Sequence, residues 1–211
     1  MDNVTPTVTR IGAASDETIA DWLAARLRRA FRSSEAPVAV TVPGGSTPFP
    51  IIERLLEQDL PWERLVVWPN DDRMVPEDHE ASNTGKLRAL FEPAGAEVAA
   101  LDVMEQVPHF ALTWLGMGAD GHIASLFPNT DPRADDPRSL VQLTPDPLPP
   151  EAPYDRISLT ISALLGSDEL VFVIRGAEKN DVMTAAIEGA SDLPVARLLA
   201  AARRQVTVFA G

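Results

Sequence analysis

A histidine stands inside a glycine-rich loop that follows an apolar stretch of the sequence. Residues 115–128 read LGMGADGHIASLFP, and His122 comes directly after Asp120 and Gly121. An imidazole can accept a proton from water near neutral pH when the two are within hydrogen-bonding reach. A core histidine would normally lie in an apolar pattern, so this polar loop favours His122 as a general base. Asp120 either orients the imidazole or only shapes the turn.

The same loop also matches the G-x-G-x-x-G pattern of dinucleotide-binding proteins through Gly116, Gly118 and Gly121. In those proteins the last glycine lies within a helix that continues for several turns. Here Pro128 follows too soon, and the Pro- and Asp-rich residues after it predict a loop. The pattern therefore favours a tight loop that carries His122 over a nucleotide site.

A second loop has the composition of a phosphate-binding site. Residues 42–50 read VPGGSTPFP. The glycines let the backbone approach a ligand, and the N–H groups and dipole of the helix that follows, aided by two hydroxyl groups, would bind an anion. The alternative is a tight turn in which Ser or Thr only caps the helix. The candidate residues are Gly44, Gly45, Ser46 and Thr47.

Charged residues follow the apolar run 64–69. Asp71 and Asp72 are candidate substrate-binding residues, and Arg73 could stabilise an anion or a developing oxyanion without changing its own protonation. The simpler alternative is a solvated charged loop. Further along the chain, Arg156 begins the segment RISLT.

Lys179 is one of only two lysines in the chain, and it lies near the expected start of a helix. It is a candidate phosphate-binding cation, and the alternative is a solvated surface lysine. Because the net charge is −13, an anionic substrate needs such a local group of bases. The same charge argues against a nucleic-acid partner.

Composition excludes several kinds of site. The chain has no cysteine, and its three histidines at positions 79, 109 and 122 have no regular short spacing, so the residues do not make a zinc site. We expect neither a metal nor a cofactor. Ser46 and Ser125 lack the G-x-S-x-G elbow of serine hydrolases. The N-terminal end is polar and no apolar run could span a membrane, so we expect a cytoplasmic protein without a membrane partner.

Helical and strand patterns alternate along the chain. Strands are predicted in 37–42, 64–69, 109–115, 156–162, 169–174 and 205–210, and helices in 15–31, 48–56, near 83–91, in 176–189 and after Pro194. A polar loop is predicted through Ser82 and another in 128–153. This order predicts an α/β domain, residues 1–211, with a mostly parallel sheet covered on both faces. Ligands bind such sheets beyond the carboxyl ends of the strands, which is where the candidate loops lie.

Taken together, the motifs resemble a known family. PGGSTP, DDRMVP followed by SN, LGMGADGHIASLFP, RISLT and GAEKNDVM occur in the order seen in 6-phosphogluconolactonases, within the superfamily that includes glucosamine-6-phosphate deaminase. The resemblance implies a three-layer α/β/α fold with a Rossmann-like sheet, no metal, and a phosphorylated sugar lactone as substrate. The implied reaction is hydrolysis of 6-phospho-D-glucono-1,5-lactone to 6-phosphogluconate in the oxidative pentose phosphate pathway.

By matched position, the resemblance makes His122 the base and lets Arg73 stabilise negative charge at the lactone. The phosphate group would be held by Gly44, Gly45, Ser46, Thr47, Arg156 and Lys179. Asp72 stands where these lactonases usually have glutamate, and the segment 92–110 is short and lacks the helix expected there. We expect a monomer or a small homo-oligomer.

Two other functions compete with the lactonase. The deaminase has a glutamate where this chain has Phe127 and a tyrosine where it has Arg73, and its proton transfers need that additional acid. A non-catalytic sugar-phosphate sensor would not need His122 beside a reactive carbonyl. The sequence favours lactone hydrolysis over both.

Overall fold

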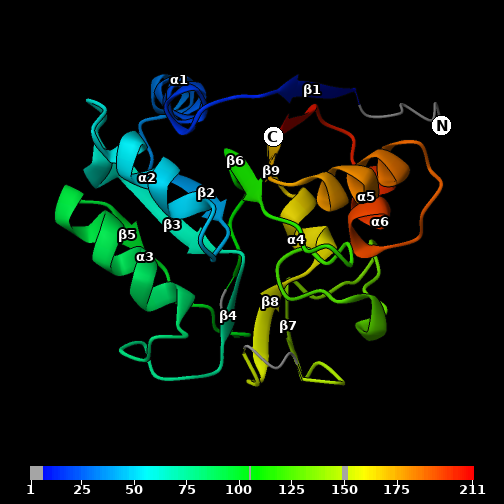
Figure 1. Ribbon diagram of the computed structural model, residues 1–211. Coiled ribbons are helices and arrows are strands. Elements are labelled where there is room, and N and C mark those ends of the chain that lie inside the picture. Colours follow the sequence, from blue (N-terminus) through cyan, green and yellow to red (C-terminus); the bar gives the residue numbers. More distant parts are fainter. Residues whose placement is uncertain (1–6, 105, 149–151) are drawn as a thin grey trace.

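Seven parallel strands form the centre of the molecule (Figure 1). The computed structural model describes residues 7–104, 106–148 and 152–211. The strands are β1 (Val8–Gly12), β2 (Val38–Val42), β3 (Leu65–Pro69), β5 (Glu97–Val98), β6 (Leu112–Leu115), β9 (Leu170–Ile174) and β10 (Val206–Ala210). They lie in the order β1-β10-β9-β6-β2-β3-β5, and every neighbouring pair is parallel.

Helices cover both faces of this sheet. They are α1 (Asp16–Ser33), α2 (Pro48–Leu56), α3 (Asn83–Phe91), α4 (Ile161–Leu165), α5 (Ala177–Ile187) and α6 (Pro194–Ala201). The apolar side chains of α1, α2 and α3 belong to one buried cluster, and those of α4, α5 and α6 belong to another. The prediction of a three-layer α/β/α fold with a mostly parallel sheet is confirmed.

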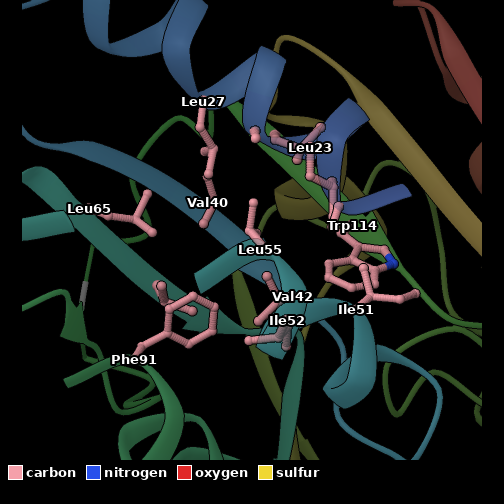
Figure 2. Close-up of a cluster of buried hydrophobic side chains, with 14 of the residues drawn as sticks. Leu23, Leu27, Val40, Val42, Ile51, Ile52, Leu55, Leu65, Phe91 and Trp114 are labelled. Carbon is pink, nitrogen blue, oxygen red and sulfur yellow. The ribbon is translucent and has the colours of Figure 1, made fainter. Parts of the chain in front are cut away.

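Alternation along the strands creates the two clusters. In β9, Val171 and Val173 pack with the α1 and α2 side, whereas Leu170, Phe172 and Ile174 pack with the α5 and α6 side. Successive side chains of a strand point to opposite faces, so a strand buried on both faces must be apolar throughout. Figure 2 shows the first cluster, in which side chains of α1 and α2 meet those of β2 and β3.

Ser15 caps the first helix, which was predicted over residues 15–31 and begins at Asp16. Its hydroxyl accepts a hydrogen bond from the backbone N–H of Thr18 at 3.1 Å, and acidic residues occupy the first turn. Both features favour a helix start, because they satisfy a free N–H group and suit the positive end of the helix dipole. The helix then buries the apolar face that the sequence periodicity predicts.

A second, antiparallel sheet was not predicted. It consists of β4 (Asp71–Arg73), β8 (Arg156–Leu159) and β7 (Leu140–Leu143), in that order. The prediction of unbroken polar loops through Ser82 and over 128–153 is therefore wrong at β4 and β7. These short strands lack a clear apolar alternation, and pairing with β8 is what holds them extended.

The edge strands, the segment 92–110 and the N-terminal end complete the comparison between the predicted and the observed elements. Strands β1 and β5 were not predicted, and both lie at the edges of the main sheet. Among the described residues of 92–110 there is one 3-10 turn and β5 but no α-helix, as expected from the short segment. The first residues of the polar N-terminal end lie outside the described part of the chain. Within that part, no helix has both the length and the apolar character needed to cross a membrane.

The buried cluster around α1 should contribute strongly to stability. Leu23, which is 1% exposed, lies within it. Leu23→Ala should lower the free energy of unfolding by about 2–5 kcal/mol, because it removes buried methyl groups and leaves a cavity. Met104→Ala, at a side chain that is 86% exposed, should change it by less than about 0.5 kcal/mol. Urea denaturation measures both, and equal effects would contradict this account of the core.

Candidate active site

The loops that follow β2, β6 and β9 open onto one cavity of about 420 Å³. These three strands are adjacent and parallel, so their carboxyl ends meet at one edge of the sheet. The short strand β4 adds residues from one side. The cavity is lined by backbone or side-chain atoms of Pro43, Gly44, Gly45, Ser46, Thr47, Pro48, Asp71, Arg73, Asn83, Trp114, Gly116, Met117, Gly118, His122, Ala124, Val173, Arg175 and Lys179.

The imidazole of His122 is held by Asp120. Nδ1 of His122 lies 2.6 Å from Oδ1 of Asp120, which also accepts the backbone N–H of His122 at 3.2 Å. The hydrogen bond with the His122 side chain lowers the pKa of Asp120, so this carboxyl is ionised at neutral pH. An ionised carboxylate can only accept, so Nδ1 donates and the lone pair of Nε2 is left to take a proton.

The glycines of the loop make room for the His122 ring and allow the tight turn before it. A Cβ atom at Gly118 would overlap the His122 ring, and Gly121 has a positive φ of 77°. Gly118 also accepts the backbone N–H of Gly121 at 3.1 Å, and its own N–H donates to His122 at 3.0 Å. The pattern that resembles a nucleotide fingerprint is therefore a tight turn that makes room for an imidazole.

Arg73 is fixed by the start of α3. Its Nη1 donates to the carbonyl of Ala81 at 2.8 Å and to Oδ1 of Asn83 at 3.2 Å. Its Nε is buried and has no partner within the described residues. Asn83 in turn donates from Nδ2 to the carbonyl of Asp71 at 2.9 Å. The guanidinium thus has a defined position at the wall of the cavity.

Asp71 is a buried carboxyl that lines the cavity. Burial raises its pKa, while the hydrogen bond from the Ser125 hydroxyl and the charges of Arg73 and Arg156 act in the opposite direction. The backbone N–H of Ser125 donates to the hydroxyl of Ser158 at 3.2 Å. These bonds connect the His122 loop to β4 and β8.

Asp72 points away from that cavity and binds the N-terminus of α3. Its carboxylate accepts from the backbone N–H of Asn83 at 2.6 Å and of Thr84 at 2.9 Å, and from the Ser82 hydroxyl at 3.1 Å. It also accepts the N–H of Arg73 at 2.8 Å. A carboxylate is well suited to this place because the free N–H groups and the dipole of a helix both favour negative charge.

The hydroxyl groups of the loop after β2 make no hydrogen bond to the described residues. Thr47 precedes α2 but its side chain does not cap the helix, and neither Thr47 nor Ser46 has a side-chain hydrogen bond within the described residues. Gly45 has a positive φ of 98°. Gly44 has no room for a side chain because Asn83 fills that space. The alternative in which these hydroxyls only cap the helix is therefore not observed, because neither makes a capping hydrogen bond.

The two predicted phosphate cations lie in different surroundings. Lys179, in the first turn of α5, lines the cavity. Arg156 is 3% exposed, is not among the lining residues, and donates to the carbonyl of Ala152 at 2.7 Å. It pairs in register with Arg73, and burial followed by the charge of Arg73 lowers its pKa. Its charge interacts with those of Arg73 and Asp71, which do line the cavity.

The sequence profile of the family described as glucosamine-6-phosphate isomerases/6-phosphogluconolactonase matches residues 13–106 and 91–208. The chain belongs to this family. A relative named 6-phosphogluconolactonase from Helicobacter pylori is 33% identical over 193 residues, which cover 82% of this chain and 83% of the relative. One of the same name from Pseudomonas aeruginosa is 31% identical over 216 residues and 90% of each chain. The crystal structure of 6-phosphogluconolactonase from Thermotoga maritima superposes with a TM-score of 0.80 at 23% identity, covering 98% of this chain and 99% of that one.

In this member of the glucosamine-6-phosphate isomerase/6-phosphogluconolactonase family, sequence reasoning missed several lining residues. The position of Asn83, at the start of the helix after DDRMVP, could have suggested that it belongs to the site. Its hydrogen bond with Arg73 cannot be inferred from that position. The position of Arg175 could have suggested the same, because this base comes directly after a buried strand. Trp114 and Met117 look like ordinary core residues. Across the described ranges, no group of three or more His, Asp or Glu side chains is placed to hold a metal ion.

The bonds of Asp72 predict a structural effect. Asp72→Asn should lower the free energy of unfolding by about 2–3 kcal/mol, because an amide nitrogen would face N–H donors that the carboxylate now satisfies. Asp78→Asn, at an exposed residue in the same connection, should change it by less than about 0.5 kcal/mol. Chemical denaturation compares the two, and equal stabilities would remove Asp72 from this role.

Proposed function

We propose that this protein hydrolyses 6-phospho-D-glucono-1,5-lactone to 6-phospho-D-gluconate, the lactone-opening step of the oxidative pentose phosphate pathway. Its curated relatives carry the name 6-phosphogluconolactonase. The observation that carries the proposal is that one cavity holds an oriented imidazole together with Lys179 and the N-terminus of α2. The first group suits activation of water, and the others suit a phosphate group.

In the proposed mechanism, Nε2 of His122 removes a proton from water while the water oxygen bonds to the lactone carbonyl carbon. The guanidinium of Arg73 stabilises the negative charge on the carbonyl oxygen. The bond between that carbon and the ring oxygen then breaks, and the imidazolium returns its proton to the ring oxygen. The acid formed loses a proton to solvent and leaves as the carboxylate. Asp120 stabilises the imidazolium during these steps.

We assign the phosphate group to the loops after β2 and β9, which lie on either side of the His122 loop. The backbone N–H groups around Gly44 and Gly45, the hydroxyls of Ser46 and Thr47, and the ammonium group of Lys179 would bind it. Arg156 lies behind this surface and contributes through its charge. Asp71 lines the cavity and would contact the sugar hydroxyls, whereas Asp72 acts on the substrate only through Arg73 and Asn83.

Phe127 argues against the deaminase. Its ring centroid lies 4.7 Å from that of His122, so an apolar ring stands beside the base where that reaction needs a further acid. The sensor alternative leaves the Asp120–His122 pair without a purpose. We further propose that the protein works in the cytoplasm on a small phosphorylated lactone, as a monomer or small homo-oligomer, and without a nucleic-acid partner, since the net charge is −13.

Loss of the base should affect turnover. His122→Ala should lower kcat by about 10²–10⁴-fold with little change in KM, because general-base assistance is worth roughly that factor. The lactone, which also opens without an enzyme, is generated in situ and its disappearance is followed with and without protein. His109→Ala is a matched control, because His109 also pairs with an aspartate, Asp168, at 2.9 Å and does not line the cavity.

Two results of that experiment would be decisive against the proposal. Full activity of a folded His122→Ala variant would remove the base assignment. A wild-type rate equal to the rate without protein would remove the enzyme assignment altogether.

Asp120 should act through His122. Asp120→Asn should lower kcat by at least about tenfold, because an amide can offer the imidazole an N–H group and so leave the wrong nitrogen protonated. Asp168→Asn, which removes the carboxylate beside His109, should leave kcat unchanged. Steady-state kinetics of the two variants checks this, and an unchanged kcat in Asp120→Asn would mean that Asp120 only shapes the turn.

A further inference from the structure

We propose that Arg175 is a second phosphate-binding cation of this site, beside Lys179, and that it makes the enzyme selective for a phosphorylated lactone. This inference rests on the proposed function, and it adds a residue and a specificity to it. Arg175 lines the same cavity as Lys179 and follows the last residue of β9.

The two cations come from one connection between a strand and a helix. Gly176, with a positive φ of 95°, turns the chain after Arg175 into α5, and Lys179 lies in the first turn of that helix. The order β9-β6-β2 places this connection on one side of the His122 loop and the loop of Gly44 and Gly45 on the other. A phosphate group between them would meet positive charge from both sides.

The guanidinium of Arg175 is already oriented. Its Nη2 lies 3.0 Å from Oδ1 of Asp16 and its Nη1 donates to the carbonyl of Ala14 at 3.1 Å. Its Nε has no hydrogen-bond partner within the described residues, and the side chain is 33% exposed. Neither Asp16 nor Ala14 lines the cavity. A side chain held in this way loses little freedom when it binds an anion.

The charge of the substrate explains why a second cation is useful. A phosphate monoester carries about −1.5 to −2 charges at neutral pH. Lys179 supplies one positive charge and a helix N-terminus about half of one. Arg175 supplies a further charge, reduced in part by its ion pair with Asp16. In a chain with a net charge of −13, such a local excess of bases is needed to attract a dianion.

Arg175 could instead serve only to hold the start of α1 against β9. The two roles differ in one measurable respect. A structural role lowers activity on every substrate through the amount of folded enzyme, whereas a phosphate-binding role lowers activity only on the phosphorylated one. The ratio of kcat/KM for two substrates is independent of the amount of folded enzyme and therefore separates the two roles.

The experiment measures kcat/KM for 6-phospho-D-glucono-1,5-lactone and for unphosphorylated D-glucono-1,5-lactone. Arg175→Gln should lower the ratio of the two about tenfold, mainly through KM for the phosphorylated substrate; this factor corresponds to about 1.4 kcal/mol. Lys179→Gln should lower it in the same direction. Arg26→Gln should leave it unchanged, because Arg26 is also ion-paired, with Glu169 at 3.3 Å, is 31% exposed and does not line the cavity.

An unchanged ratio in Arg175→Gln, with or without a loss of total activity, would overturn the proposal. Failure of the proposed function is a different result, namely a wild-type rate no faster than the rate without protein. Calorimetric binding of 6-phospho-D-gluconate and of gluconate then tests Arg175 alone. Arg175→Gln must weaken the binding of 6-phospho-D-gluconate about tenfold and not that of gluconate, and equal affinity of wild type and variant for the phosphorylated ligand would overturn the inference.

Discussion

The parallel direction of β2, β6 and β9 is the constraint on which the site depends. Three adjacent strands that run the same way must end at the same edge of the sheet, so the loops after them face one cavity. The sheet is held by apolar side chains on both faces, which leaves polar chemistry to the loops. The base and the anion-binding groups are thus positioned by strands that contribute almost nothing to the chemistry themselves.

The small antiparallel sheet supplies what the parallel sheet cannot. Its strand β4 presents Asp71 and Arg73 on the face toward the cavity, and it presents Asp72 on the opposite face toward α3. Burying the cations Arg73 and Arg156 beside each other is costly, and the neighbouring carboxylates Asp71 and Asp72 offset part of that cost. The same carboxylates hold the connecting loops in place, so charge balance and geometry are set by one group of residues.

Regular elements and local motifs were predictable from the sequence, and contacts between distant residues were not. The helix expected near 83–91 is found at Asn83–Phe91, and the hydrogen bond by which Ser82 caps it involves only neighbouring residues. Strand β4 was missed because its extended form depends on β8, which is far away in the sequence. Strand β7 was missed because it lies in the stretch that its Pro and Asp content predicted as a loop, and only its pairing with β8, the next strand, holds it extended. His122 could be predicted as a candidate base because it lies in a polar, glycine-rich loop. The role of Asp72 and the position of Arg175 depend on how helices and strands pack against one another. The sequence does not reveal these contacts.

The order of the main sheet has a consequence for how the chain is made. Strand β10 inserts between β1 and β9, so β1 has no partner in the sheet until β10 has been synthesised. Until then β9 keeps an unpaired edge, which is a surface that favours aggregation. The contact of Arg175 with Asp16 and Ala14 also joins segments on either side of this late strand. A nascent chain that still lacks β10 therefore has every residue that lines the cavity but an open sheet, and it is at this stage that the protein would most need protection by a chaperone.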